Sequence, residues 1–160
     1  MKNFQNKAKI IKVSKVIRAI LYAGLVLWIV AIPVCLGAFL IPMILLPKEN
    51  QHASMTYTMC GMALQSAFAL IVNLKLFRFF DRLKNGHLFD AQTVGNLDAA
   101  GKWWIALWLY QGLFYGLGQE YFQLKMVWDS GGLFAGLILV FVAWLLKEAQ
   151  ELQEEQELTV

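Results

Sequence analysis

The chain has 160 residues, of which 59% are hydrophobic and only 16% are charged, and its net charge is +3. Soluble domains are about half apolar and about a quarter charged, so this composition argues against a water-soluble protein. The charged residues lie between apolar runs, where they orient a membrane protein rather than bind nucleic acid directly. We therefore predict an all-α integral membrane protein in contact with the lipid bilayer.

The N-terminal arm, residues 1–18, carries six basic residues and no acidic residue. Its apolar residues recur at helical spacing, so the arm should be helical and continue into the first span. The positive charge has two interpretations. It attracts anionic lipids, with on the order of 1 kcal/mol per basic residue, or it only keeps this end of the chain inside, which is the simpler interpretation.

The first apolar run, residues 19–46, is longer than the roughly 20 residues that a membrane-spanning helix needs. It also exceeds the apolar region of a cleaved signal peptide, about 7 to 15 residues, so we expect a retained helix. Pro33 lies inside this run and should bend the helix, because proline removes a backbone hydrogen bond. Residues 47–54 form a short loop after it.

The second span, residues 55–76, is less apolar than the first. Gln65 and Asn73 lie about two turns apart in it and share one helix face. Polar side chains in a span usually bond to neighbouring helices, and we expect the same of Gln111 in the third span. The alternative is that these three amides line a polar path for transport.

The longest polar segment in the interior of the chain follows, and its residues 77–101 should form a helical hairpin. Gly86 is placed to end the first helix of the hairpin in a left-handed cap. Asp90 is a good N-cap for the second helix, and Phe89 is spaced to form a hydrophobic staple with Val94. A hairpin of this kind is either a docking surface or only a well-built connection, and the sequence favours neither.

The third and fourth spans are predicted at residues 102–118 and 131–146. Three tryptophans near the start of the third span are typical of the aromatic belt at a membrane surface. Each of the two spans also carries a pair of glycines four residues apart, a spacing that lets helices approach closely. These glycines are Gly112 and Gly116 in the third span and Gly132 and Gly136 in the fourth.

The tail, residues 147–160, continues the fourth span without a helix-breaking residue. Its Glu, Gln, Ala and Leu residues are good helix formers, so one long helix should leave the membrane here. The tail is acidic and the N-terminal arm is basic, which allows contacts between them. Each exposed ion pair of that kind contributes only about 0 to 1 kcal/mol.

The basic residues predict the orientation of the spans. Of the 14 Lys and Arg residues, 12 lie in the arm, in residues 75–102 and at the start of the tail, whereas Lys48 and Lys125 lie in the two other connections. By the positive-inside rule the hairpin and both termini are cytoplasmic. We therefore predict one domain over residues 1–160, a four-span bundle in the cell inner (plasma) membrane.

The sequence shows no pattern of a reaction centre. It holds no His, Cys and carboxylate cluster with metal-ligand spacing, and His52 and His87 fall on opposite sides of the predicted membrane. No phosphate-binding loop or nucleophile elbow is present. The spans contain no acidic residue, unlike many proton-coupled carriers. We expect a protein that is not an enzyme and that has no cofactor and no metal.

Two segments of the chain resemble a bacterial family of membrane proteins, domain of unknown function 2975. They read LFRFFDRLKNGHLFDAQTVGNLDAAGKW and KEAQELQEEQELTV. The resemblance implies four spans and a cytoplasmic Arg-rich turn, and it assigns no catalytic residue. Genes of this family accompany small helix-turn-helix regulators, which implies a transcription regulator as a partner. The matching residues are Leu76, Phe77, Arg78, Gly86, Phe89, Asp90, Leu97, Gly101, Glu155, Glu157, Leu158, Thr159 and Val160.

The leading hypothesis is a non-enzymatic membrane protein that binds a cytoplasmic protein, such as a helix-turn-helix transcription regulator. The alternative is a small transporter or channel component that uses Gln65, Asn73 and Gln111. The sequence leaves the oligomeric state open. The candidate partner-binding residues are Arg78, Arg82, Lys84, Asp90, Glu151, Glu155 and Glu157.

Overall fold

The computed structural model describes residues 2–45, 49–85, 87, 90–122 and 130–158. These residues form four helices and no strand, as the sequence predicted. Each helix is longer than the span predicted within it, because it also includes the polar segment beside that span. The helices are α1 (Lys2–Leu45), α2 (Glu49–Lys84), α3 (Ala91–Phe122) and α4 (Gly131–Leu158).

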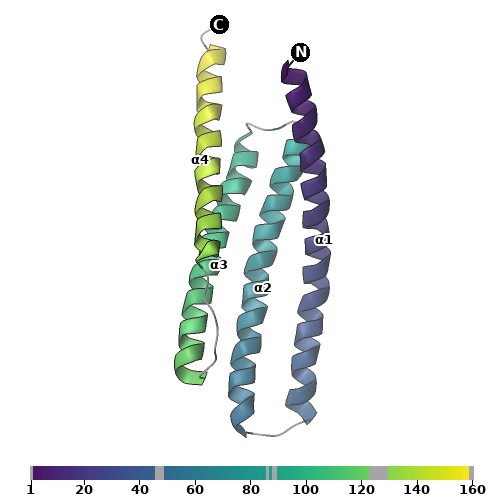
Figure 1. Ribbon diagram of the computed structural model, residues 1–160, viewed down its shortest axis with the longest axis vertical. Coiled ribbons are helices and arrows are strands. Elements are labelled where there is room, and N and C mark those ends of the chain that lie inside the picture. Colours follow the sequence, from purple (N-terminus) through teal and green to yellow (C-terminus); the bar gives the residue numbers. More distant parts are fainter. Residues whose placement is uncertain (1, 46–48, 86, 88–89, 123–129, 159–160) are drawn as a thin grey trace.

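The helices form an open row. Contacts join α1 to α2, α2 to α3 and α3 to α4, and the described residues of α1 and α4 do not touch. Figure 1 shows the row with both chain termini and the α2–α3 turn at the same end. At this end, which we call the polar end, α1 and α4 both extend past the turn (Figure 1). The predicted four-helix bundle is therefore open along the side between its first and last helices.

Long uninterrupted helices replace several predicted boundaries. The prediction of a loop over residues 47–54 is wrong for residues 49–54, which form the first turns of α2. The basic arm is helical and continues into the first apolar run, so residues 2–18 belong to α1 as predicted. Pro33 also lies inside this continuous helix. The predicted hairpin consists of the end of α2 and the start of α3, which continue into their apolar segments without a break. The hairpin is therefore rigidly connected to the apolar part of the molecule.

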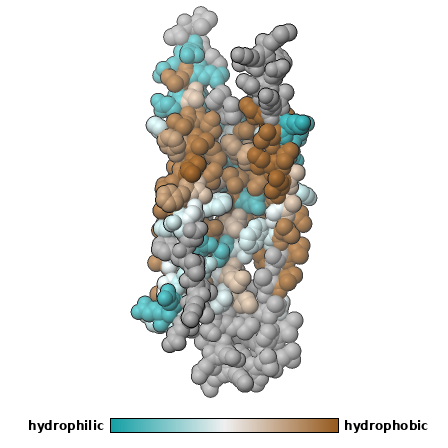
Figure 2. Space-filling view, viewed as in Figure 1, coloured by the Kyte–Doolittle hydropathy of each residue, from teal (hydrophilic) through white to brown (hydrophobic). Residues whose placement is uncertain are grey.

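Three helices are long and apolar enough to cross a membrane. The segments are Ile10–Val34 in α1, Thr56–Lys84 in α2 and Gly131–Gln156 in α4. Helix α3 is long enough, with 32 residues, but the low hydropathy of its Trp, Tyr, Gln and Gly residues keeps it out of this group. Figure 2 shows apolar surface over the middle of the molecule and hydrophilic surface on the polar end of α4.

Large apolar side chains point outward along the row. Leu27 and Leu113 are exposed over 69% and 70% of their surface, and Phe134 over 61%. The core is small by comparison and lies toward the polar end, where Phe79, Leu97 and Ala143 bring α2, α3 and α4 together. This distribution suits a protein whose apolar surface faces lipid, because lipid tails are as apolar as leucine.

Glycine allows α3 and α4 to approach at backbone distance. A Cβ atom added at Gly101 would lie 2.9 Å from the backbone nitrogen of Val140, and one added at Gly136 would lie 3.2 Å from the carbonyl oxygen of Gly101. A Cβ atom added at Gly132 would lie 3.1 Å from the side chain of Trp108. The glycine pair of the fourth span therefore lies at a helix contact, whereas an atom added at Gly116 would meet nothing within 4 Å.

This contrast predicts opposite effects for two substitutions on the same helix. Gly101→Ala should destabilise the protein by about 1–3 kcal/mol, because the added methyl group pushes α4 away. Gly116→Ala should be neutral or should stabilise α3 by up to about 1 kcal/mol, because alanine favours helix and the site is open. Thermal unfolding of both variants in the same detergent measures the difference. Equal melting temperatures for the two variants would contradict the close contact.

Candidate partner-binding surface at the polar end

The end of α2 is closed by backbone hydrogen bonds. The amide of Asn85 donates to the carbonyl of Arg82 at 3.0 Å, and the amide of His87 donates to the same carbonyl at 3.1 Å. The bond from His87 spans five residues, as in the Schellman cap that the sequence predicted here. Gly86 itself lies outside the described residues.

Asp90 caps the start of α3. Its carboxylate accepts the amide of Gln92 at 3.4 Å, and its carbonyl accepts the amide of Thr93 at 2.8 Å. The fully buried Thr93 hydroxyl donates to the carbonyl of His87 at 2.9 Å, which fastens the turn to α3. The predicted staple between Phe89 and Val94 involves residue 89, which is outside the described residues.

The side chain of Arg82 braces the turn. Its guanidinium group donates to the carboxylate of Asp90 and to the side-chain oxygen of Gln92. One side chain at the end of α2 therefore holds two residues at the start of α3. Arg82 and Asp90 are accordingly partners of each other, and their main contribution is to the shape of the hairpin. Sequence reasoning proposed both residues as contact sites but did not pair them.

A second ion pair joins α1 to α2 near the turn. Arg18 contacts the carboxylate of Asp81 at 2.8 Å, and its guanidinium lies 5.2 Å from the centre of the Phe77 ring. The ring of Tyr22 lies 6.5 Å from the same phenylalanine. Sequence reasoning treated Arg18 as one of the basic charges of the arm, which attract anionic lipids or set the topology. It did not pair Arg18 with Asp81, because nothing in a linear pattern indicates which residue of α2 it faces.

A basic hollow of about 480 Å³ lies between α2 and α3. Its charged lining consists of Lys75, Arg78 and Arg82, with Asp81 as the one acidic residue. Arg78 is exposed. Unlike Arg82, it takes no part in the brace formed with Asp90 and Gln92. The hollow therefore offers a positively charged side chain on a rigid turn, which is the chemistry that an acidic partner would require. The neutral lining residues are Gln92, Gly95 and Asn96.

A wider groove of about 670 Å³ lies between α3 and α4. Val94 and Ala143 contribute apolar surface to it. Two ion pairs follow its length, Asp98 with Lys102 at 2.6 Å and Lys147 with Glu151 at 3.6 Å. Beyond the groove α4 continues as an exposed, acidic helix, which confirms the predicted helical tail through Leu158.

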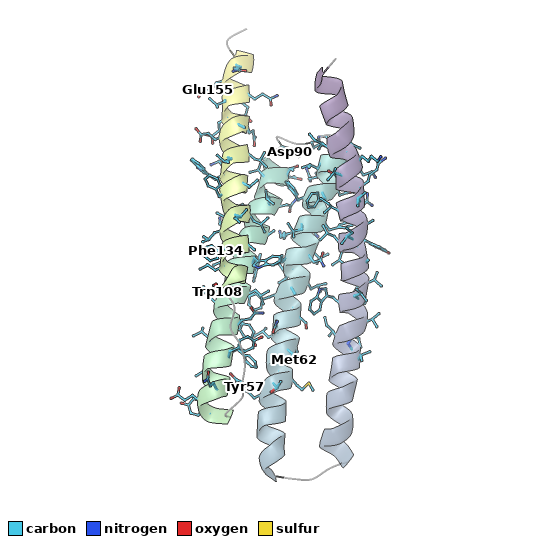
Figure 3. The ribbon with its side chains drawn as sticks, in the orientation of Figure 1. Tyr57, Met62, Asp90, Trp108, Phe134 and Glu155 are labelled. Carbon is cyan, nitrogen blue, oxygen red and sulfur yellow. The ribbon has the colours of Figure 1, made fainter. Side chains whose placement is uncertain are left out.

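The structure separates the candidate residues into several places. Arg78 and Arg82 share the basic hollow, whereas Lys84 lines a different pocket against α1. Figure 3 shows Asp90 at the turn and Glu155 farther out along α4. Glu151 lines the groove between α3 and α4, and Glu157 belongs to the helical tail. A partner that touched all of them would have to cover the whole polar end.

Aromatic rings line the contact between the second and third spans. Between α2 and α3 the rings of Tyr57 and Phe114 stack at 4.4 Å, and those of Phe68 and Tyr110 at 5.5 Å. The hydroxyl of Tyr110 also donates to the carbonyl of Gly61 at 3.1 Å. These rings fill the contact between the two helices with apolar and hydrogen-bonded groups.

Asn73 lies at the other face of α2, against α1. A Cβ atom added at Gly24 would lie 3.0 Å from its side-chain nitrogen. Its side-chain oxygen is buried and has no hydrogen-bond partner among the described residues. Gln65 and Gln111 are half-buried. The hollows at the polar end are lined by other residues, so the polar path through the three amides stays a prediction.

Fold and site define an all-helical protein with helices that can cross a membrane and with a charged, internally braced turn. A family model described as a protein of unknown function, DUF2975, matches residues 5–160. The chain belongs to this family, as its central and C-terminal segments indicated. No curated protein and no solved structure matches it. Among the described residues, no three His, Cys or carboxylate side chains are grouped as metal ligands.

The brace and the cap can be tested separately. Asp90→Ala should cost about 1 kcal/mol, because it removes a helix cap, and it also removes the partner of Arg82. Hydrogen exchange at the amides of Gln92 and Thr93 should then rise roughly fivefold. Asp90→Ser keeps a capping oxygen and should restore most of the protection without the charge. Unchanged exchange in Asp90→Ala would mean that the carboxylate does not hold the turn.

Proposed function

We propose that this protein resides in the cell inner (plasma) membrane and binds a cytoplasmic protein through its polar end, without a catalytic step. The observation that carries the proposal is the exposed Arg78 in a basic hollow beside a turn held by Arg82 and Asp90. A braced turn loses little conformational entropy on binding, so a partner can use the charge of Arg78 at low cost.

The direction of the helices supports four membrane crossings. Helices α2 and α4 both run toward the polar end, as the chain order in Figure 1 indicates. If both cross the membrane, the chain must return between them, and α3 lies beside both and runs back. The weak apolarity of α3 is compatible with a crossing, because it packs against a helix on each side.

The charge distribution supports a cytoplasmic polar end. The arm, the hairpin with the flanking Lys75 and Lys102, and the start of the tail meet at this end, and they hold 12 of the 14 Lys and Arg residues. The positive-inside rule depends on residues close to the ends of the spans, where most of these lie.

Single cysteines test this orientation. In a protein whose own two cysteines are replaced by alanine, His87→Cys and Glu155→Cys should resist a membrane-impermeant maleimide on intact cells. His52→Cys should be labelled under the same conditions, because it belongs to the start of α2, at the opposite end of the molecule. All three should react after the cells are opened. Labelling of residue 87 or 155 from outside would reject a cytoplasmic polar end.

The chemistry of the hollow defines the partner surface. Lys75, Arg78 and Arg82 outnumber Asp81, and that carboxylate already pairs with Arg18. An acidic segment of a partner protein fits this charge. Family resemblance points to a helix-turn-helix transcription regulator, which this protein would hold at the membrane. The exposed tail of α4 would add a second, acidic contact that suits a basic region of the same partner.

Charge reversal at Arg78 tests this surface. Arg78→Glu should reduce recovery of the partner from solubilised membranes at least tenfold, because reversal at an interface replaces attraction by repulsion. Lys102→Glu is the matched control, since Lys102 is exposed and lies on the α3–α4 side. Quantitative mass spectrometry measures the amount of each co-purified protein, and the variants are compared at equal amounts of the purified membrane protein. The proposal fails if Arg78→Glu retains the same proteins as the unaltered chain.

A further inference from the structure

A separate basic pocket of about 480 Å³ lies between α1 and the end of α2. Three of its lining residues, Lys15, Arg18 and Lys84, are cationic, and the lining contains no acidic residue. Ala19 and Tyr22 complete it. This pocket, which we call the α1–α2 pocket, is separate from the hollow that contains Arg78. Lys84, one of the candidate partner-binding residues, lines this pocket and not that hollow.

Arg18 is held in place at this pocket. Its ion pair with Asp81 measures 2.8 Å, and its guanidinium lies over the ring of Phe77. A guanidinium group has five donors in a planar fork, so one carboxylate does not use all of them. A fixed arginine can therefore bind a second anion without ordering its own long side chain. Phosphate oxygens match the geometry of that fork.

The charge around the pocket calls for an anion. Asp81 balances one of the three cations, and neither Lys15 nor Lys84 makes an ion pair with another described residue. Two positive charges are thus left to attract a ligand. A phosphodiester group carries one negative charge and has two free oxygens, so one such group could contact both a lysine and Arg18.

The surroundings of the pocket favour a lipid over a soluble phosphate. Below the pocket, Val26 and Ile29 follow Tyr22 on the same face of α1. They are exposed over 44% and 62% of their surface, and these side chains suit acyl chains. Tyr22 is 61% exposed, as is typical of an aromatic residue whose hydroxyl reaches the headgroup region. Figure 2 shows extensive apolar surface on the described part of α1. A soluble anion would gain nothing from these features.

We infer that the α1–α2 pocket binds the phosphodiester headgroup of an anionic phospholipid, whose acyl chains lie along α1. Basic pockets between helices at a membrane surface are known to recognise such headgroups. The inference requires that the chain reside in a bilayer, but it does not require the partner protein. Arg78 and its hollow are left intact by every substitution that tests it.

The test measures lipid binding by the full-length protein in detergent. Native mass spectrometry gives the affinity for dioleoylphosphatidylglycerol and, as a neutral comparison, dioleoylphosphatidylcholine. Lys15→Gln with Lys84→Gln should weaken phosphatidylglycerol binding roughly 25-fold, since each basic residue near anionic lipid contributes a factor of about five. Lys102→Gln with Lys147→Gln removes the same charge from two side chains that are each 67% exposed, and should leave binding unchanged.

Additional variants and ligands distinguish a lipid site from a folding defect, a general charge effect and a soluble ligand. Lys15→Arg with Lys84→Arg keeps the charge and should keep the affinity, which shows that loss in the glutamine variant is not a folding defect. Equal weakening in the Lys102 and Lys147 control would overturn the inference in favour of a general charge effect. Displacement of the lipid by glycerophosphoglycerol at equal concentration would also overturn it, because the ligand would then be a soluble phosphodiester. Equal affinity for both lipids would exclude an anion site.

Discussion

Close packing at glycine is the constraint on which this structure depends. Each pair of neighbouring helices contains such a contact. The side chain of Asn73 lies against Gly24 and the ring of Phe114 against Gly61, whereas at Gly101 and Gly136 the two backbones themselves meet. In a bilayer, burial of a leucine between helices gains little, because lipid solvates it equally well. The association of the helices is then favoured by dispersion contacts across closely packed surfaces and by polar contacts between helices. Glycine at these positions allows both.

The same constraint explains why the interior is small. Few apolar side chains are buried, and those that form a cluster, such as Phe79 and Leu97, lie near the polar end. Helix α1 packs against α2 alone, so its position depends on a few specific contacts. Near the polar end these are the ion pair of Arg18 with Asp81 and the stacking on Phe77. Between α1 and α2, a charged contact thus takes at this end the place that the apolar cluster has between α2, α3 and α4.

Much of the fold could be predicted from the sequence, because it follows from local patterns. The length of the apolar runs predicted the long helices. Gly86 and Asp90 predicted where the turn begins and ends. The brace from Arg82 to Asp90 and the ion pair from Arg18 to Asp81 could not be predicted. Each depends on the rotation of one helix about its axis relative to another. An apolar segment exposed on most faces leaves that rotation undetermined.

The candidate site, like the fold, could be predicted from the sequence only in part. Sequence composition identified the polar end as the surface rich in charge, and the structure sorts its charges by role. Arg82 and Asp90 form the brace, whereas Arg78 remains exposed in the hollow. A list of charged residues cannot make this distinction, since all three are equally polar. Only the partners of each side chain separate a residue that shapes the turn from one that can bind something else.

Asp81 connects the two sides of α2. Its carboxylate pairs with Arg18 beside the α1–α2 pocket, and the same residue lines the hollow that contains Arg78. A phosphate that bound the remaining donors of Arg18 would weaken its pair with Asp81, and that carboxylate would then lower the positive charge of the hollow. By linkage, an acidic partner in the hollow would affect lipid binding to the same extent. One carboxylate on a single helix would therefore couple the proposed lipid pocket to the proposed partner surface.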